Sequence, residues 1–295
     1  MDAFWIILTG TLTASASGLL GCYLLLRKLS LLGDAISHAV LPGIFLAYWL
    51  SGTRASGYML VGAALFGMLC AWLIELMQQK ARLQSDAATG AVFTFLFAVG
   101  VILISAFSGQ VDLDQDCILY GEIAYVPLDT WISANGTNLG PIAVWQMGFT
   151  FLLVLVMIIV GYRGLLVSTF DAEYAQTLGI STAFWHYLLT GAVSLNTVVA
   201  FNSIGAVLTS AFLVVPAATA YLLTRKLHIM LLLSVVVGFL AAISGYYLAS
   251  IVDGSIGGAM TVALGGWFLL ALAAYLLKTR FVSAIPMQIE LSDSK

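Results

Sequence analysis

The chain has 295 residues, of which 61% are hydrophobic and only 8% are charged, with a formal net charge of -3 and a mean hydropathy of +1.04. This composition excludes a soluble globular domain, and no basic stretch with interleaved aromatic residues indicates nucleic-acid binding. Because the apolar residues run in long blocks, the sequence predicts an all-α, polytopic membrane protein.

Nine apolar segments of spanning length follow one another along the chain. The first begins near the N-terminus without a basic region before it, so we expect a retained helix and not a cleaved signal peptide. The weakest division is between the sixth and seventh, which only the polar turn Asn202-Ser203 separates, and a single long bent element is the alternative. The segments are 4–26, 33–51, 57–78, 87–108, 144–161, 184–201, 204–223, 229–251 and 257–277.

The basic residues favour nine helices with the N-terminus outside and the C-terminus inside. In that arrangement ten of the eleven Lys and Arg residues lie in the cytoplasm, and only Arg54 lies outside. Joining the sixth and seventh segments would move Arg225 and Lys226 to the wrong face. We therefore expect one transmembrane domain over residues 1–280 and a polar cytoplasmic tail over 281–295.

An Asp and a His inside the second apolar segment are the strongest functional signal. Asp34 and His38 are four residues apart, which places both side chains on one helix face about 6 Å apart along its axis. A carboxylate and an imidazole suit a divalent cation such as manganese, zinc or iron. The alternative is a structural pair that packs two helices, although ionisable groups at membrane depth are costly and tend to be functional. Pro42 predicts a kink that frees the His38 carbonyl.

The connection 109–141 is expected outside and contains five acidic and no basic residues. Its apolar stretches 117–120 and 123–128 suggest a short interfacial or partly re-entrant helix. Such a loop either forms an acidic vestibule that concentrates cations or is a solvated loop with an amphipathic cover. Both interpretations remain open.

A second connection, on the cytoplasmic side, predicts a short helix parallel to the membrane. Asp171 fits its N-cap, and Gly179 fits the position just after its end. Further along, Pro216 inside the seventh segment predicts a kink that lines a cavity or permits a close helix contact.

Several kinds of chemistry are absent from the sequence. No lysine follows a glycine, so the chain cannot supply a phosphate-binding P-loop. No His-Glu-x-x-His pair occurs, and Cys22, Cys70 and Cys117 are too scattered for a disulfide framework or a metal cluster. We expect a protein that is not an enzyme in its own right and holds no permanent cofactor.

Three stretches together resemble the membrane permease subunits of ABC-type manganese/zinc/iron importers. The first, 27–43, reads RKLSLLGDAISHAVLPG; the second, 170–180, reads FDAEYAQTLGI; the third, 214–228, reads VVPAATAYLLTRKLH. The resemblance spans nearly all of residues 4–280. The second stretch also resembles the loop that couples ABC importers to their ATPase, in which Glu-Ala-Ala is followed three residues later by Gly. Glu173, Ala175 and Gly179 match that pattern, and Tyr174 replaces its middle alanine.

The resemblance implies a type II importer permease in the bacterial plasma (inner) membrane. Its expected partners are a second permease subunit, identical or homologous, two cytoplasmic ATP-hydrolysing subunits and an extracytoplasmic metal-binding protein. It also implies that Asp34 and His38 line the path of a divalent metal that is cargo, and that Asp171, Glu173, Ala175 and Gly179 belong to the coupling loop.

The alternative function is a self-sufficient, gradient-driven metal transporter. A cytoplasmic surface helix is expected for docking an ATPase and has no obvious use in a lone carrier. The inverted repeats of many secondary transporters would also supply a second Asp/His element, and the sequence has none. A scaffold that transports nothing would leave the Asp34/His38 pair unexplained.

Overall fold

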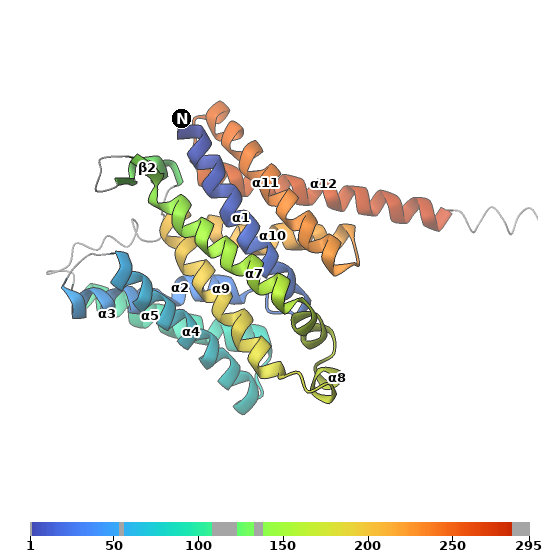
Figure 1. The fold of residues 1–295 in the computed structure, drawn as a ribbon, viewed down its shortest axis with the longest axis horizontal. Helices are drawn as coiled ribbons and strands as arrows, with labels where there is room; N and C mark the ends of the chain where they lie inside the picture. Colours follow the sequence, from blue (N-terminus) through green and yellow to red (C-terminus); the bar gives the residue numbers. More distant parts are fainter. Residues whose placement is uncertain (1, 53–55, 108–122, 133–137, 285–295) are drawn as a thin grey trace, which may run out of the picture.

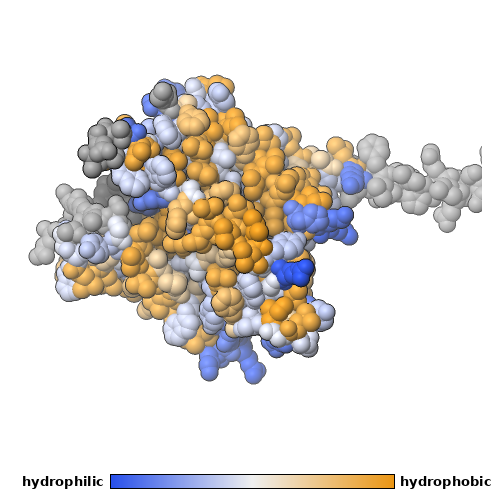
Figure 2. Space-filling view, viewed as in Figure 1, coloured by the Kyte–Doolittle hydropathy of each residue, from blue (hydrophilic) through white to orange (hydrophobic). Residues whose placement is uncertain are grey.

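The computed structural model describes residues 2–52, 56–107, 123–132 and 138–284. In this part of the chain almost every residue belongs to a helix, and short turns join the helices (Figure 1). Eight of the described helices are long and apolar enough to cross a membrane. Hydrophobic residues cover most of the face in Figure 2, and hydrophilic residues gather at its margins, as expected for a surface that meets lipid.

Each long helix begins within two residues of the start of a predicted segment. The long helices are α1 (Asp2–Leu26), α4 (Ser56–Lys80), α5 (Ser85–Phe107), α7 (Ile142–Phe170), α9 (Thr182–Ile204), α10 (Ala206–Leu223), α11 (Leu227–Val252) and α12 (Ile256–Ala284). The short elements are α2 (Leu32–Ala39), α3 (Leu41–Ser51), the 3₁₀ helix η1 (Ile123–Leu128), the strands β1 (Thr130–Ile132) and β2 (Asn138–Pro141), and α8 (Ala172–Thr177).

The apolar segment expected as one span over 33–51 is not one continuous helix, because the structure divides it at Val40 into α2 and α3. These helices have 8 and 11 residues, and a helix that crosses the bilayer alone needs about 20. Pro42, the second residue of α3, has no N–H to donate to the His38 carbonyl, and its ring crowds that carbonyl. The described residues therefore contain eight long helices and one broken pair.

The sixth and seventh segments are separate helices, as the charge distribution indicated, but the turn is not at Asn202-Ser203. The helix α9 continues through both residues to Ile204, and the chain turns at Gly205. Gly205 has a φ of +82°, a conformation that glycine adopts without the steric cost of a Cβ.

The helix α7 continues to Phe170, well past the expected end at 161, because its extension packs against α9. Gly161 and Gly164 lie directly under the indole ring of Trp185, and a Cβ on either glycine would collide with that ring. This contact places the end of α7, and α8 after it, beside the start of α9 (Figure 1).

The connection before α7 contains the predicted short helix and an unexpected β-hairpin. The 3₁₀ helix η1 buries Ile123 and Val126, and β1 pairs antiparallel with β2. Four of the five acidic residues of the predicted outer loop, Asp112, Asp114, Asp116 and Glu122, lie outside the described residues. Residues 285–295 of the predicted tail also lie outside them, and residues 281–284 belong to α12.

The short helix α2 lies in the interior of the helical assembly. It packs against α4, α5, α9 and α10. On the other side α10 packs against α1, which also contacts α7 and α11. Four helices therefore pack around α2, which carries Asp34 and His38. The helices α1 and α7 run from this region to the end of the molecule where α8 lies (Figure 1).

Candidate functional site

The helix α2 places Asp34 in its first turn and His38 in its last. The neighbouring residues Ala35 and Ile36 are fully packed into the core. The Ser37 hydroxyl donates to the Gly33 carbonyl at 3.0 Å, so it is satisfied within its own helix. A carboxylate near a helix N-terminus is favoured by the helix dipole. The fold therefore holds Asp34 and His38 on the one face of α2 that is not covered by packing.

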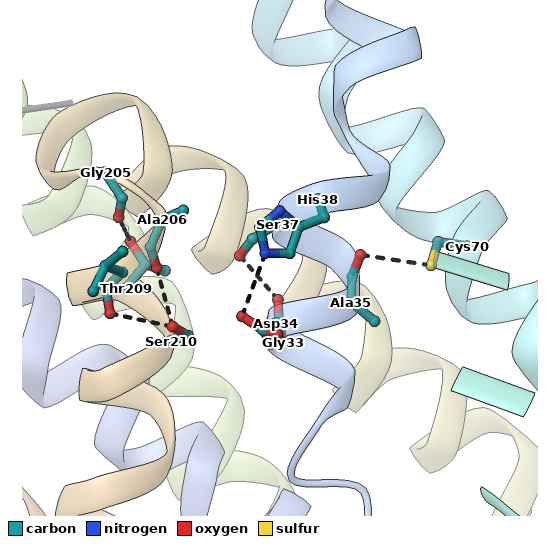
Figure 3. A network of polar contacts seen from close by, with 11 residues as sticks. Gly33, Asp34, Ala35, Ser37, His38, Cys70, Gly205, Ala206, Thr209 and Ser210 are labelled. Carbon is teal, nitrogen blue, oxygen red and sulfur yellow. Dashed lines mark hydrogen bonds and ion pairs between the residues drawn. The ribbon is translucent and has the colours of Figure 1, made fainter. Parts of the chain in front are cut away.

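The two side chains lie close together without a hydrogen bond between them (Figure 3). His38 Nε2 is 3.8 Å from Asp34 Oδ1, beyond the range of a hydrogen bond. Two ligands at about 2.1 Å from one ion are at most about 4.2 Å apart. The spacing therefore permits both atoms to bind one cation, and it does not match a structural Asp–His hydrogen bond.

Both side chains are reachable from outside the chain. The exposed fraction is 46% for the Asp34 side chain and 31% for that of His38. The His38 ring meets the edge of Phe97 at a centroid distance of 5.7 Å and lies 6.0 Å from Phe93, both on α5. These aromatic rings restrict the orientation of the imidazole while the carboxylate stays open.

The backbone of α2 is held by close contacts with its neighbours. Gly33 lies against Leu213 of α10, and a Cβ at position 33 would collide with that side chain. On the opposite side, Cys70 Sγ of α4 lies 4.0 Å from the Ala35 carbonyl. The hydroxyls of Thr209 and Ser210 on α10 donate to the carbonyls of Gly205 and Ala206, at the start of that helix (Figure 3). The contacts of Gly33 and Ala35 hold the backbone beside Asp34 against α10 and α4.

The described part of the chain offers no large cluster of metal-ligating side chains. Within it, no group of three or more His, Cys, Asp and Glu side chains is placed to hold a metal ion. An ion held between Asp34 and His38 would therefore need further ligands from water, from the rest of the chain or from another subunit.

The predicted surface helix is present as α8, with both of its predicted ends. Asp171 is the N-cap, and its Oδ1 accepts a hydrogen bond from the Tyr174 N–H at 2.9 Å. Gly179 has a φ of +74°, and the N–H groups of Gly179 and Ile180 donate to the carbonyls of Gln176 and Ala175. This is the Schellman arrangement, which requires a left-handed residue just after the helix. Both predicted end residues are confirmed.

The two faces of α8 differ in exposure. Ala175 is completely buried, whereas Glu173 is exposed. The side chains of Phe170, Tyr174 and Leu178 are exposed by 62%, 55% and 53%. Tyr174 and Leu178 are four residues apart, so they lie on one side of α8, and Phe170 ends α7 just before the extended residue Asp171.

Among the polar contacts between helices in the described residues, three involve a charged or amide side chain and a distant partner, and no sequence pattern pointed to them. Arg27 donates to the hydroxyls of Ser168 and Thr169. Glu75 lies 3.7 Å from His186. In the core, Asn196 donates to the Ser17 hydroxyl at 2.9 Å. The partners are far apart in sequence, so no local spacing signals them.

Pro216 lies inside α10, which continues through it to Leu223. The ring is buried, and one turn before it α1 approaches very closely. A Cβ on Gly21 would collide with the Leu213 carbonyl. Pro216 was expected either to line a cavity or to permit a close helix contact, and the structure shows a close helix contact beside it.

Comparison with known proteins gives consistent matches. Residues 3–275 match the model of the ABC 3 transport family. The manganese transport system membrane protein MntD of Bacillus subtilis is 45% identical over 88% of this chain and 88% of its own length. The zinc transport system membrane protein TroD of Treponema pallidum is 42% identical over 90% of this chain and 72% of its own. The chelated iron transport system membrane protein YfeD of Yersinia pestis is 31% identical over 90% and 83%.

A solved structure shares the fold. A chain of PsaBC from Streptococcus pneumoniae in complex with Fab superimposes with a TM-score of 0.73 and 30% sequence identity. The match covers 90% of this chain and 89% of that chain.

Proposed function

The chain belongs to the ABC 3 transport family, and from this premise we propose that Asp34 and His38 bind the transported cation in passing while α8 docks the ATPase. The protein is a multi-pass membrane permease of a bacterial ABC importer for manganese, zinc or iron. It has the type II importer permease fold, and a separate subunit hydrolyses ATP. Family membership thus decides against a gradient-driven carrier.

The geometry of the Asp34/His38 pair carries the proposal. Asp34 supplies a hard carboxyl oxygen, and His38 supplies an imidazole nitrogen at 3.8 Å from it. This mixed donor set suits manganese, zinc and iron alike. A site with only two ligands from each subunit suits a transporter, because the ion must leave again.

A second permease subunit, identical or homologous, would complete the site. Two such subunits facing each other would offer two carboxylates and two imidazoles to one ion. The Asp34 side chain is 46% exposed in the isolated chain. This exposure supports a site with one open side, which the second subunit would cover. An extracytoplasmic metal-binding protein would deliver the ion to the outer face, with the N-terminus of the permease outside and α8 inside.

The surface of α8 supports its docking role. The end of α7 and the short helix α8 expose three large apolar side chains in the chain alone, Phe170, Tyr174 and Leu178, which we call the apolar strip. Exposed apolar patches of this kind mark protein–protein contacts. Glu173, beside the strip, would bond a basic or backbone donor of the ATPase.

Uptake of radioactive manganese or zinc by cells that carry Asp34→Asn tests the proposal. The substitution keeps the shape and much of the hydrogen-bonding capacity but removes the charge, so we expect uptake to fall to the level of cells without the permease. Asp86→Asn is the matched control, because Asp86 is exposed in the first turn of α5, away from α2. Wild-type uptake by an Asp34→Asn permease of normal abundance would exclude the site.

A further inference from the structure

Arg27 connects the end of α1 to the end of α7. Its Nε donates to Thr169 Oγ1 at 3.0 Å, and its Nη2 donates to Ser168 Oγ at 2.9 Å. One planar guanidinium thus makes two directed hydrogen bonds to adjacent residues of another helix. The contact joins residues that are 142 and 141 positions apart in the sequence.

The two ends of this contact belong to the two functional elements of the permease. On one side, Arg27 precedes α2 with Asp34 and His38. On the other side, Ser168 and Thr169 lie in the last turn of α7, directly before Asp171, which caps α8. The contact therefore lies between the docking helix and the helix that carries the cation ligands.

The linker between Arg27 and α2 is a closed, hydrogen-bonded turn. The N–H groups of Lys28 and Leu29 donate to the carbonyls of Leu25 and Leu24, with Lys28 at a φ of +58°. This is a Schellman turn like the one that ends α8. Leu32 N–H then donates to the Leu29 carbonyl. A displacement of Arg27 is therefore passed to the start of α2 and is not absorbed by a loose loop.

The partners of Arg27 are neutral, so the contact serves geometry more than charge. Within the described residues no carboxylate forms an ion pair with the guanidinium. Burial lowers the pKa of Arg27, but a guanidinium remains charged at neutral pH. The Ser168 hydroxyl also donates to the Leu165 carbonyl at 3.3 Å, which orients its lone pairs. A lysine, with one freely rotating ammonium, cannot reproduce the two parallel bonds.

We propose that Arg27 is a positioning residue that passes the movement of α8 to α2, so that ATP hydrolysis changes the access of the Asp34/His38 site. This inference rests on the docking role of α8 proposed above. Movement of the ATPase displaces α8 and the last turn of α7. The two hydrogen bonds of the Arg27 guanidinium, the Arg27 fork, then displace the α1–α2 linker with them. Loss of the fork leaves both elements folded but weakens the mechanical connection between them.

The test measures manganese or zinc ions transported per ATP hydrolysed by the complete importer, with its ATPase and binding protein, in proteoliposomes. Arg27→Lys keeps the charge and loses the fork, and the double variant Ser168→Ala/Thr169→Val removes both acceptors. We expect each to lower the ratio about tenfold, the size of losing a hydrogen bond to a charged group. The combined variant should be no worse than either, because all three residues form one contact. Arg163→Lys, at an exposed position on α7, is the control with an unchanged ratio.

The outcomes separate this inference from the proposed function. A wild-type ratio in Arg27→Lys, or losses that multiply in the combined variant, overturns the link. If Arg27→Lys does not accumulate in the membrane, a wild-type ratio in Ser168→Ala/Thr169→Val overturns it instead. Gly179→Val in the same assay tests α8 itself. A wild-type ratio of ions to ATP in Gly179→Val refutes coupling through α8. A lowered ratio in Gly179→Val together with a normal ratio in Arg27→Lys refutes only the role of Arg27. A lowered abundance with a normal ratio identifies a merely structural contact.

Discussion

Small side chains set how closely the helices around α2 approach one another. Gly21 of α1 lies against the backbone of α10 at Leu213, whose side chain in turn lies against Gly33 of α2. Between apolar helices in lipid, association depends on such close packing, because burial of apolar surface gives little advantage over contact with lipid. Gly21 and Gly33 therefore define the position of the residue next to Asp34.

At this scale we predict that Gly21→Ala destabilises the permease. The added Cβ would meet the Leu213 backbone, with its carbonyl carbon at 2.9 Å and the Ala217 Cβ at 3.3 Å. Because the backbone cannot yield as a flexible side chain does, α1 and α10 must separate, at a cost of about 1–3 kcal/mol. The measurement is the apparent melting temperature of the purified protein in detergent, which should fall.

Gly191→Ala is the matched control for that experiment. Gly191 lies inside α9, and no atom lies within 4 Å of a Cβ added there. Alanine favours a helix over glycine by up to about 1 kcal/mol, so the melting temperature should stay constant or rise. An equal melting temperature for Gly21→Ala and the wild type would contradict the close contact of α1 with α10.

At the scale of elements, α8 is a short helix whose ends are fixed by its own residues. A helix of 6 residues is too short to be stable by propagation alone. The Asp171 cap satisfies one N–H at its start, and the turn at Gly179 satisfies carbonyls at its end. Burial of Ala175 then anchors it beside α7 and α9.

We predict that Gly179→Val uncouples transport or weakens assembly with the ATPase, while the membrane helices stay folded. No atom lies within 4 Å of a Cβ at this position, so valine causes no collision there. Its cost is the φ of +74°, which disfavours a residue with a Cβ by roughly 1–2 kcal/mol. Co-purification of the ATPase and the rate of metal uptake measure the effect.

Gly179→Asn distinguishes this conformational effect from a general sensitivity of the position. Asparagine is larger than glycine but tolerates left-handed backbone angles. It should retain most of the uptake that Gly179→Val loses. Equal losses in both variants would show that the side chain, and not the left-handed turn, causes the defect.

At the scale of the whole molecule, the outer faces of the long helices are apolar and largely uncovered. Exposed side chains include Leu232, Ile251 and Leu269, on α11 and α12. Such faces suit contact with lipid or with another permease subunit, as expected for a multi-pass membrane protein. The orientation of the bundle then depends on the basic residues at its two ends.

We predict that α8 faces the cytoplasm and η1 faces outward. Gln176→Cys on α8 and Leu128→Cys at the end of η1 are both exposed positions, whereas the neighbouring Ala175 is buried and unsuitable. In a variant without Cys22, Cys70 and Cys117, an impermeant thiol reagent added to spheroplasts should label position 128 and not position 176. Permeabilisation should make position 176 reactive. Labelling of position 176 in intact spheroplasts would refute the orientation.

The features that the sequence determined are those that depend on neighbouring residues. Spans follow from the summed hydropathy of contiguous residues. The Asp34/His38 pair follows from i,i+4 geometry, and the ends of α8 from the preferences of Asp171 and Gly179. Each signal is local, so the surrounding fold did not need to be known. The apolar block 57–78, and every later one, was found for the same reason.

Only the tertiary structure decided which helix faces meet. In a membrane helix the core face and the lipid face are both apolar, so periodicity does not distinguish them. The contact of Arg27 with Ser168 and Thr169, the pairing of Glu75 with His186, and the approach of Gly21 to Leu213 therefore have no signature in the sequence. The break at Val40 also depended on the structure, because proline in a membrane helix is compatible with a kinked span as well as with two short helices. Here α2 ends at Ala39 and packs against four neighbouring helices, and α3 begins separately at Leu41, directly before Pro42.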